Sequence, residues 1–134
     1  MDEKKFRSLM GMAKSLQIDN DRSEYWIGFQ RGVRRAYHGD NFGTDGEHEK
    51  YMNCRDGEYR FQLQTGYRTG FYHDQLKMRS GDDIQKLRKL LGLSASEMAE
   101  ILSVSNRTVE GWEQGRPIPD AIIKLIKNYF SIDN

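Results

Sequence analysis

Apolar residues recur at helical spacing along the chain, most regularly between residues 82 and 130. Such spacing predicts amphipathic helices. No stretch shows the sustained alternation of a strand, so we expect few or no strands. The apolar stripes predicted for four successive C-terminal helices are Ile84, Leu87 and Leu91; Met98, Ala99 and Leu102; Val109 and Trp112; and Ile122, Leu125, Ile126 and Tyr129.

Residues that favour helix ends stand between these stripes. Gly92 is placed to end the first helix and Gly115 the third, because glycine readily adopts the left-handed conformation found after a helix. Ser94 is a good N-cap for the second helix, and Glu97 three residues later completes a capping box. Ser105 is a good N-cap for the third. Two short helices joined by a tight turn predict a helix-turn-helix motif.

The first 79 residues carry a weaker helical pattern. A second helix should begin near Asp21 or Ser23, both good N-caps. A turn-rich loop, GDNFGTDGE, precedes a short helix at EHEKYMN and a longer one at RFQLQTGYRTGFYH. GFQRG and GYRTG each carry glycines four apart, which permits close helix packing. The expected stripes are Phe6, Leu9, Met10, Ala13 and Leu16; Tyr25, Phe29, Val33 and Tyr37; and Leu63, Tyr67, Gly70 and Phe71.

The segment MRSGDD, residues 78–83, is predicted to link two domains. The composition changes after it, since residues 80–134 contain no histidine or cysteine. We therefore expect an all-α protein. It would have a small N-terminal helical domain over residues 1–79, of uncertain role, and a C-terminal helix-turn-helix domain over residues 80–134.

The segment LRKLLGLSASEMAEILSVSNRTVEGWEQGRPIP resembles the Xre/Cro-repressor type of helix-turn-helix regulator, which has the lambda-repressor-like fold. The resemblance covers about the last 50 residues and extends to antitoxins and to the autorepressors beside anti-CRISPR genes. It implies double-stranded DNA as partner, with the third helix entering the major groove N-terminus first. It also implies an ion pair between Arg88 and Glu113. The expected function is that of a transcriptional repressor acting at its own operon.

Candidate DNA contacts lie on the predicted exposed face of the third helix. Asn106 has the geometry to pair bidentately with adenine, and Arg107 with guanine. The bland alternative for each is a solvated polar side chain. Hydroxyls and the backbone amides at the start of the second helix are suited to phosphates. The base-reading candidates are Asn106, Arg107, Glu110 and Gly111, and the DNA-backbone candidates are Ser94, Ala95, Ser96, Ser105, Thr108, Gln114 and Arg116.

Two positions depart from the pattern of the family. Ala95 stands where members often place a polar side chain, and Gly111 stands where they often have a reading side chain. Glycine inside a helix costs roughly 1 kcal/mol relative to alanine. Our hypothesis is that Gly111 gives the helix clearance to sit closer to the groove. Gly111→Ala would then be more stable but bind DNA less well.

Residues 80–134 carry 7 Lys/Arg and 8 Asp/Glu, hence a net charge of −1. Counterion-driven affinity from this half alone should therefore be modest. A homodimer that binds two half-sites of an inverted repeat would compensate. Ile123 and Phe130, seven residues apart on the last helix, are predicted to form the dimer seam, with an extension of the core as the alternative.

Arg31, Arg34 and Arg35 fall on one face of the second predicted helix, beside aromatic residues. Such a patch can bind phosphate or RNA, although a solvated face is the commoner reading. The segments YWIGFQRGVRRAYHG and GYRTGF are faintly similar to ribosome modulation factor, a small helical protein that binds ribosomal RNA. An RNA- or ribosome-binding protein is therefore one alternative function, and an antitoxin-type protein-interaction module is another.

Overall composition narrows the remaining classes. The chain has 134 residues, a formal net charge of +1 and one cysteine, Cys54, so no intrachain disulfide can form. No apolar run approaches the roughly 20 residues that span a bilayer, and we expect a cytoplasmic protein without membrane contact. We also expect no enzymatic activity, cofactor or metal. The spacing of His38, His48 and Cys54 matches no zinc pattern, and NFGTDG lacks the final glutamate of an EF-hand.

Overall fold

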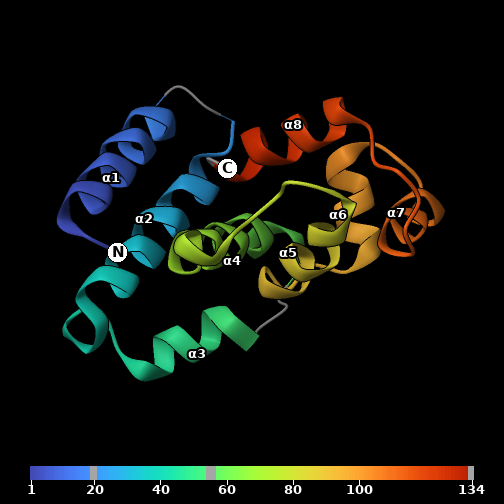
Figure 1. Ribbon diagram of the computed structural model, residues 1–134. Coiled ribbons are helices and arrows are strands. Elements are labelled where there is room, and N and C mark those ends of the chain that lie inside the picture. The colour runs from blue at the N-terminus through green and yellow to red at the C-terminus, as the bar shows by residue number, and fades with distance from the viewer. Residues whose placement is uncertain (19–20, 54–56, 133–134) are drawn as a thin grey trace. The chain divides into compact units, whose positions relative to one another are not determined.

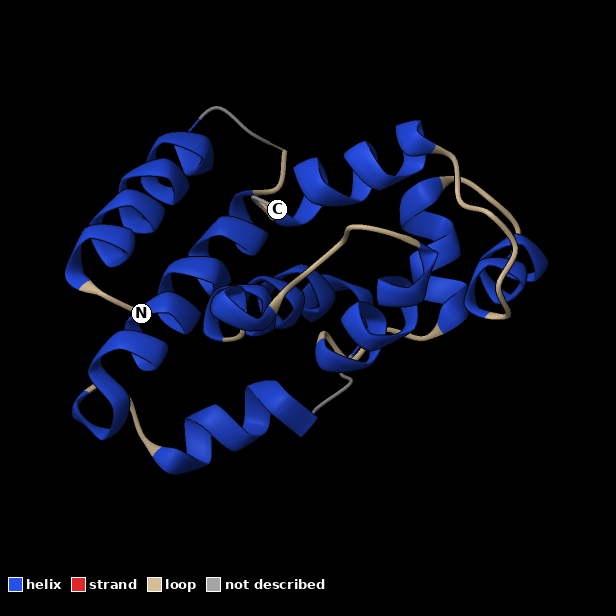
Figure 2. Cartoon of the chain, in the orientation of Figure 1, coloured by secondary structure: helices blue, strands red, loops and turns tan. Residues whose placement is uncertain are grey.

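The computed structural model describes residues 1–18, 21–53 and 57–132, and within these ranges every regular element is a helix (Figure 2). The chain divides into two compact units, Met1–Asp74 and Gln75–Asn134. The predicted all-α class is confirmed. Across the described ranges, no helix combines the length and apolar character that crossing a bilayer requires.

The N-terminal unit is organised around its second helix, which packs against both the first and the fourth (Figure 1). The third helix contacts the fourth. Short 3-10 turns, η1 (Gly39–Asn41) and η2 (His73–Gln75), follow the second and fourth helices. The four helices are α1 (Glu3–Ile18), α2 (Ser23–His38), α3 (Asp45–Asn53) and α4 (Gly57–Phe71).

Glycines bring α2 and α4 to backbone contact. A Cβ atom at Gly28 would overlap the carbonyl oxygen of Leu63, and one at Gly32 would overlap that of Tyr67. The relation is reciprocal, because Cβ atoms at Gly66 and Gly70 would overlap carbonyl oxygens of α2. The two G-x-x-x-G segments therefore face each other across one helix crossing, which only glycine permits at this distance.

Aromatic side chains fill the space beside this crossing. Tyr25, Phe29 and Val33 are fully buried, as their four-residue spacing predicts. Phe29 makes an edge-to-face contact with Trp26, and Phe6 of α1 stacks on Tyr37 with ring centroids 4.3 Å apart. Burial of such rings contributes to the stability of this unit.

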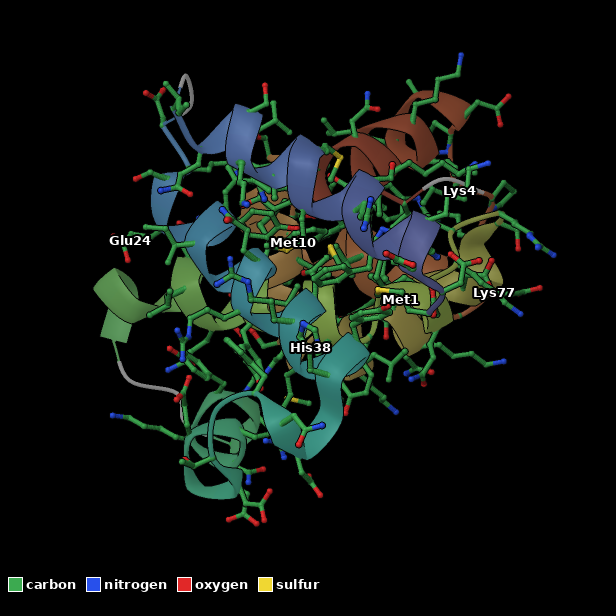
Figure 3. All side chains as sticks on the ribbon, turned by 90° about the vertical axis from the view of Figure 1, so that its left-hand side faces the viewer. Met1, Lys4, Met10, Glu24, His38 and Lys77 are labelled. Atoms are coloured by element: carbon green, nitrogen blue, oxygen red, sulfur yellow. The ribbon has the colours of Figure 1, made fainter. Side chains whose placement is uncertain are left out.

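The first helix has one buried and one exposed side. Met10 is buried, whereas Lys4 on the same helix is exposed (Figure 3). The second helix begins at Ser23, as predicted, but the predicted N-cap is wrong. Its N-cap residue is Arg22, without a capping side-chain hydrogen bond, rather than Asp21 or Ser23.

The C-terminal unit begins with a 3-10 turn, η3 (Gly81–Asp83), and contains four short helices. Every predicted apolar position of its first three helices is buried. The four helices are α5 (Ile84–Leu90), α6 (Ala95–Leu102), α7 (Asn106–Glu113) and α8 (Asp120–Phe130).

The predicted end signals of these helices are confirmed. The backbone amide of Glu97 donates to Ser94 Oγ at 3.0 Å, and the amide of Ser94 donates to Glu97 Oε1 at 2.7 Å, which completes the capping box. Ser105 Oγ accepts from the amide of Thr108 at 3.1 Å. Gly92 has a positive φ of 68°, which ends α5. Local sequence signals therefore set the ends of these helices.

The apolar stripe of α8 differs from the predicted one. Ile126 is fully buried, as expected, but Leu125 is 42% exposed although we predicted it in the core. Phe130, predicted at a dimer seam, is fully buried in the chain. Successive residues of an α-helix are about 100° apart around its axis. The buried face of α8 is therefore rotated by one residue position from the predicted face.

Candidate functional site

A tight turn sets α7 against α6. Ser103 adopts the left-handed conformation, with φ 56° and ψ 42°, and caps the end of α6. The amide of Val104 donates to the carbonyl of Ala99 at 3.0 Å. Only Ser103, Val104 and Ser105 separate the two helices. The chain thus reverses quickly enough for both helices to pack on one core.

The third helix of this unit, α7, has a buried side and a polar side. Val109 and Trp112 are buried, at 0% and 5% exposure. Asn106, Arg107 and Glu110 are exposed on the other side, where they reach solvent. The structure therefore brings the predicted base-reading residues together on one surface, and their role in reading bases stays a prediction.

Hydroxyl and amide groups flank this surface. Ser105 Oγ and Thr108 Oγ1 are 2.8 Å apart and share a hydrogen bond. Ser96 is exposed, whereas Ala95 is half-buried. The amide of Ser94 is engaged by the Glu97 carboxylate, so the amides of residues 95 and 96 are the better candidates for a phosphate. The capping box predicted from the sequence already implies this distinction.

An ion pair ties α7 to α5. Arg88 Nη2 donates to Glu113 Oε1 at 2.8 Å and Arg88 Nε donates to Oε2 at 3.2 Å, a bidentate arrangement. Arg88 Nη1 also donates to the carbonyl of Leu93 at 3.0 Å. The side chains are only 16% and 7% exposed. The expected pair is confirmed, and it fixes the C-terminal end of α7 relative to the loop after α5.

The guanidinium of Arg116 lies directly over Gly111. A Cβ atom built on Gly111 would be 3.0 Å from Arg116 Cζ. The clearance that we expected at Gly111 is thus occupied by a side chain of the same unit. Sequence reasoning missed this contact. Two features of the sequence could have indicated the contact. They are the glycine at position 111, in the last turn of α7, and the arginine directly after Gly115.

Residues 84–131 match the helix-turn-helix family. The C-terminal unit contains a helix-turn-helix domain of the Xre type. This is a class of DNA-binding domain, and its α6 and α7 are the two helices of the motif.

Antitoxin HigA-2 of Vibrio cholerae serotype O1 is 35% identical to the chain over an alignment of 54 residues, and the match covers 37% of this chain and 52% of that protein. The chain therefore spans about half the length of this curated relative. No solved structure matches the chain significantly.

The three arginines of α2 do not form one open patch. Arg35 is buried; its Nη2 donates to Asp45 Oδ1 at 2.8 Å and its Nη1 to the carbonyl of Phe42 at 3.1 Å. Arg31 Nε donates to Glu47 Oε1 at 3.0 Å. These hydrogen bonds to Asp45 and Glu47 raise the pKa of Arg35 and of Arg31. Phosphate binding here stays a prediction, and it would compete with two carboxylates.

Arg34, the remaining arginine of that predicted patch, is half-buried. Its guanidinium carbon lies 5.9 Å from the centre of the Phe42 ring. That distance is at the outer limit of a cation–π contact. The Arg34 side chain therefore lies near Phe42, in the segment between α2 and α3.

The histidines of the N-terminal unit contact aromatic rings. His48 Nδ1 lies 2.7 Å from the hydroxyl of Tyr67, whose ring stacks on Tyr51. Burial raises the pKa of Tyr67 to about 12, and burial together with the positive charge of Arg35 lowers the pKa of His48. His38 contacts the ring of Phe6.

Metal ligands do not gather in the described ranges, where no three His, Cys, Asp or Glu side chains form a group suited to a metal ion. Cys54 lies outside the described residues.

Proposed function

We propose that the protein is a sequence-specific, double-stranded DNA-binding transcriptional regulator, acting as a dimeric repressor of its own operon. The observation that carries the proposal is α7 itself. Val109 and Trp112 hold it to the core, while Asn106 and Arg107 are exposed at its first turn. The match of residues 84–131 to the helix-turn-helix family supports the same conclusion.

The first turn of α7 would enter the major groove. There the side-chain amide of Asn106 offers one hydrogen-bond donor and one acceptor to adenine. The guanidinium of Arg107 offers two donors to guanine. Ser105, Thr108 and the amides at the start of α6 would contact phosphates and fix the register. The Arg88–Glu113 pair would keep α7 at a constant angle to this surface.

A second copy of the chain would supply the second half-site. The low charge of residues 80–134 makes one domain a weak non-specific binder, and two linked half-sites strengthen binding without new contacts. Leu125 is exposed on α8, whereas Ile123, two residues earlier, is half-buried and points to another side of the helix. We propose Leu125 as the centre of the seam, in place of the buried Phe130. Leu125→Glu should shift a dimer to monomer in analytical ultracentrifugation and weaken binding to an inverted repeat.

The test of DNA reading uses the duplex upstream of the gene and two matched double variants. Asn106→Ala with Arg107→Ala removes an amide and a cation from α7. Gln85→Ala with Lys89→Ala removes the same groups from exposed positions of α5. We expect the first to lower specific affinity by about 100-fold, since each bidentate pair discriminates by roughly 1–3 kcal/mol. The second should stay within about twofold. Unchanged sequence preference in the α7 variant would refute the proposal.

The similarity to antitoxin HigA-2 favours a role as an antitoxin for this regulator. An antitoxin would bind a protein partner as well as DNA. We propose that this partner is encoded beside the gene. Co-expression with each neighbouring gene followed by purification through the tagged regulator tests this. A stoichiometric complex would support the antitoxin setting, and a regulator that purifies alone in every case would contradict it.

A further inference from the structure

The end of α7 is a tight turn with two defining hydrogen bonds. Gly115 has a positive φ of 105°, and its amide donates to the carbonyl of Trp112 at 3.2 Å. The amide of Arg116 donates to the carbonyl of Gly111 at 2.9 Å. This is the Schellman pattern, in which the residue after the left-handed one folds back toward the last turn of the helix. Residues 111 and 116 are therefore neighbours by construction.

The usual contact between these two positions is apolar, but here one partner is glycine and the other arginine. A Cβ atom at Gly111 would lie 3.0 Å from Arg116 Cζ, 3.1 Å from Nη1 and 3.2 Å from Nε. Such similar distances mean that position 111 meets the flat face of the guanidinium. The N–H groups lie in that plane, so they point along the surface of α7 and not into the helix.

The guanidinium thus occupies the place of the missing side chain at position 111. That place is one helical turn beyond Arg107 and on the same face of α7. Arg116 is exposed. The turn that carries it is held in place, because Gly81 of η3 lies against Ile118 and the carbonyl of Arg116, with distances of 3.5 and 3.8 Å from the position of a Cβ atom on Gly81.

We infer that Arg116 is a specificity-determining residue that reads a guanine from the place vacated at position 111, with Gly111 as its positioning residue. The inference rests on the proposed function and deepens it. It replaces the contact to the DNA backbone that the sequence predicts for Arg116. A planar guanidinium is suited to the O6 and N7 acceptors of guanine. It also explains why a helix of the reading motif retains a glycine.

The experiment begins with a random 20-base-pair library from which the full-length wild-type protein selects its site. Affinity is then measured for that duplex and for each single base-pair substitution. Arg116→Ala removes the guanidinium, and Arg116→Lys keeps the charge but loses the two-donor fork. Gly111→Leu fills the place of the guanidinium and retains Arg116. Lys124→Ala, at an exposed position of α8, controls for the loss of one positive charge.

We expect Arg116→Ala, Arg116→Lys and Gly111→Leu each to lose discrimination at the same guanine by about ten- to hundredfold. Arg116→Ala with Gly111→Leu should lose no more than either alone, because both remove one contact. Lys124→Ala should keep the full profile. Circular dichroism shows whether each variant retains its helices.

Different results separate the two proposals. If Arg116→Ala weakens all duplexes equally while Arg116→Lys behaves like wild type, Arg116 contacts phosphate and this inference is wrong, but the proposed function stands. Additive losses in the double variant would also overturn it. If the wild-type protein enriches no sequence, the proposed function fails and this inference fails with it.

Discussion

The two units of the molecule are stabilised in different ways. In the N-terminal unit, four glycines let the backbones of α2 and α4 touch, and aromatic side chains surround the crossing. In the C-terminal unit, the helices are short, serine side chains cap α6 and α7, and an ion pair joins α5 to α7. The first unit depends on the absence of side chains at a few positions. The second depends on side chains that satisfy helix ends and charges.

This difference determines how each unit should respond to substitution. A close helix crossing has no alternative arrangement when a methyl group is added, because backbone atoms cannot turn aside. A capped helix loses one hydrogen bond or one charge at a time, and neighbours or water compensate in part. We therefore expect abrupt failure in the N-terminal unit and graded losses in the C-terminal unit.

The largest effect should come from Gly28→Ala. Its methyl group would overlap the carbonyl oxygen of Leu63, so α2 and α4 must separate. We expect a loss of about 3 kcal/mol or more in the free energy of unfolding, measured by urea denaturation. Hydrogen exchange should increase in both helices.

Gly11→Ala provides the matched control for Gly28→Ala. Nothing lies within 4 Å of the new methyl group on α1, so helix propensity should raise stability by about 0.5–1 kcal/mol. A Gly28→Ala protein as stable as wild type would show that the crossing is not a steric limit.

The next effect should come from Arg88→Met. It leaves the carboxylate of Glu113, which is 7% exposed, without its bidentate partner. Removing one member of a buried pair is costly, and we expect a loss of about 2–3 kcal/mol for this partly exposed one. The double variant Arg88→Met with Glu113→Leu should recover part of that loss in the same urea experiment. A double variant less stable than either single variant would show that the loss does not come from the unpaired carboxylate.

A smaller effect, of opposite sign, is expected for Ser103→Gly. Ser103 has a φ of 56°, a conformation that costs a non-glycine residue roughly 1–2 kcal/mol. Part of the gain is offset by the greater freedom of glycine in the unfolded chain. The net stabilisation should be about 0.5–1 kcal/mol in thermal unfolding. Ser103→Ala is the control and should bring no gain, since alanine has the same restriction.

The smallest effect concerns pH and the N-terminal unit. Burial and the charge of Arg35 lower the pKa of His48 below 6.5 in the folded state. The unfolded chain therefore binds more protons between the folded pKa and about 6.5, so stability falls as the pH drops through that interval. Above it the contribution of His48 is fully present. His48→Gln should flatten the stability profile between pH 7 and pH 5, and an unchanged slope would assign it to other groups.

More of the C-terminal unit than of the N-terminal unit could be predicted from the sequence, because the caps that stabilise its helices are local. The capping box of Ser94 and the cap of Ser105 act within four residues, so a local pattern reveals them. Apolar stripes identify the buried side of α7 because its polar positions are unambiguous. The buried stripe of α8 was harder to identify, because its own isoleucine, leucine and aromatic residues are distributed around the helix. Several of its faces therefore look apolar in the sequence. Leu125 and Phe130 were interchanged for that reason.

Contacts between distant residues remained out of reach, apart from the Arg88–Glu113 pair that the family resemblance implied. The glycine spacing indicated a close crossing but not which two helices meet. Three arginines on one face looked like a basic patch, because the sequence does not show that Asp45 and Glu47 fold back onto Arg35 and Arg31. The position of Arg116 over Gly111 requires the turn at Gly115, and a turn residue gives no direction to the side chain that follows it.

The third helix, α3, has no buried residue of its own. It is attached by two ion pairs to α2, from Asp45 and Glu47, and by the contacts of His48 and Tyr51 with Tyr67. Charge pairs of this exposure weaken as salt rises. This segment should therefore open and close as a local unit while the glycine crossing beneath it stays intact. A protease would cut here first, and sooner in high salt, leaving α2 and α4 paired.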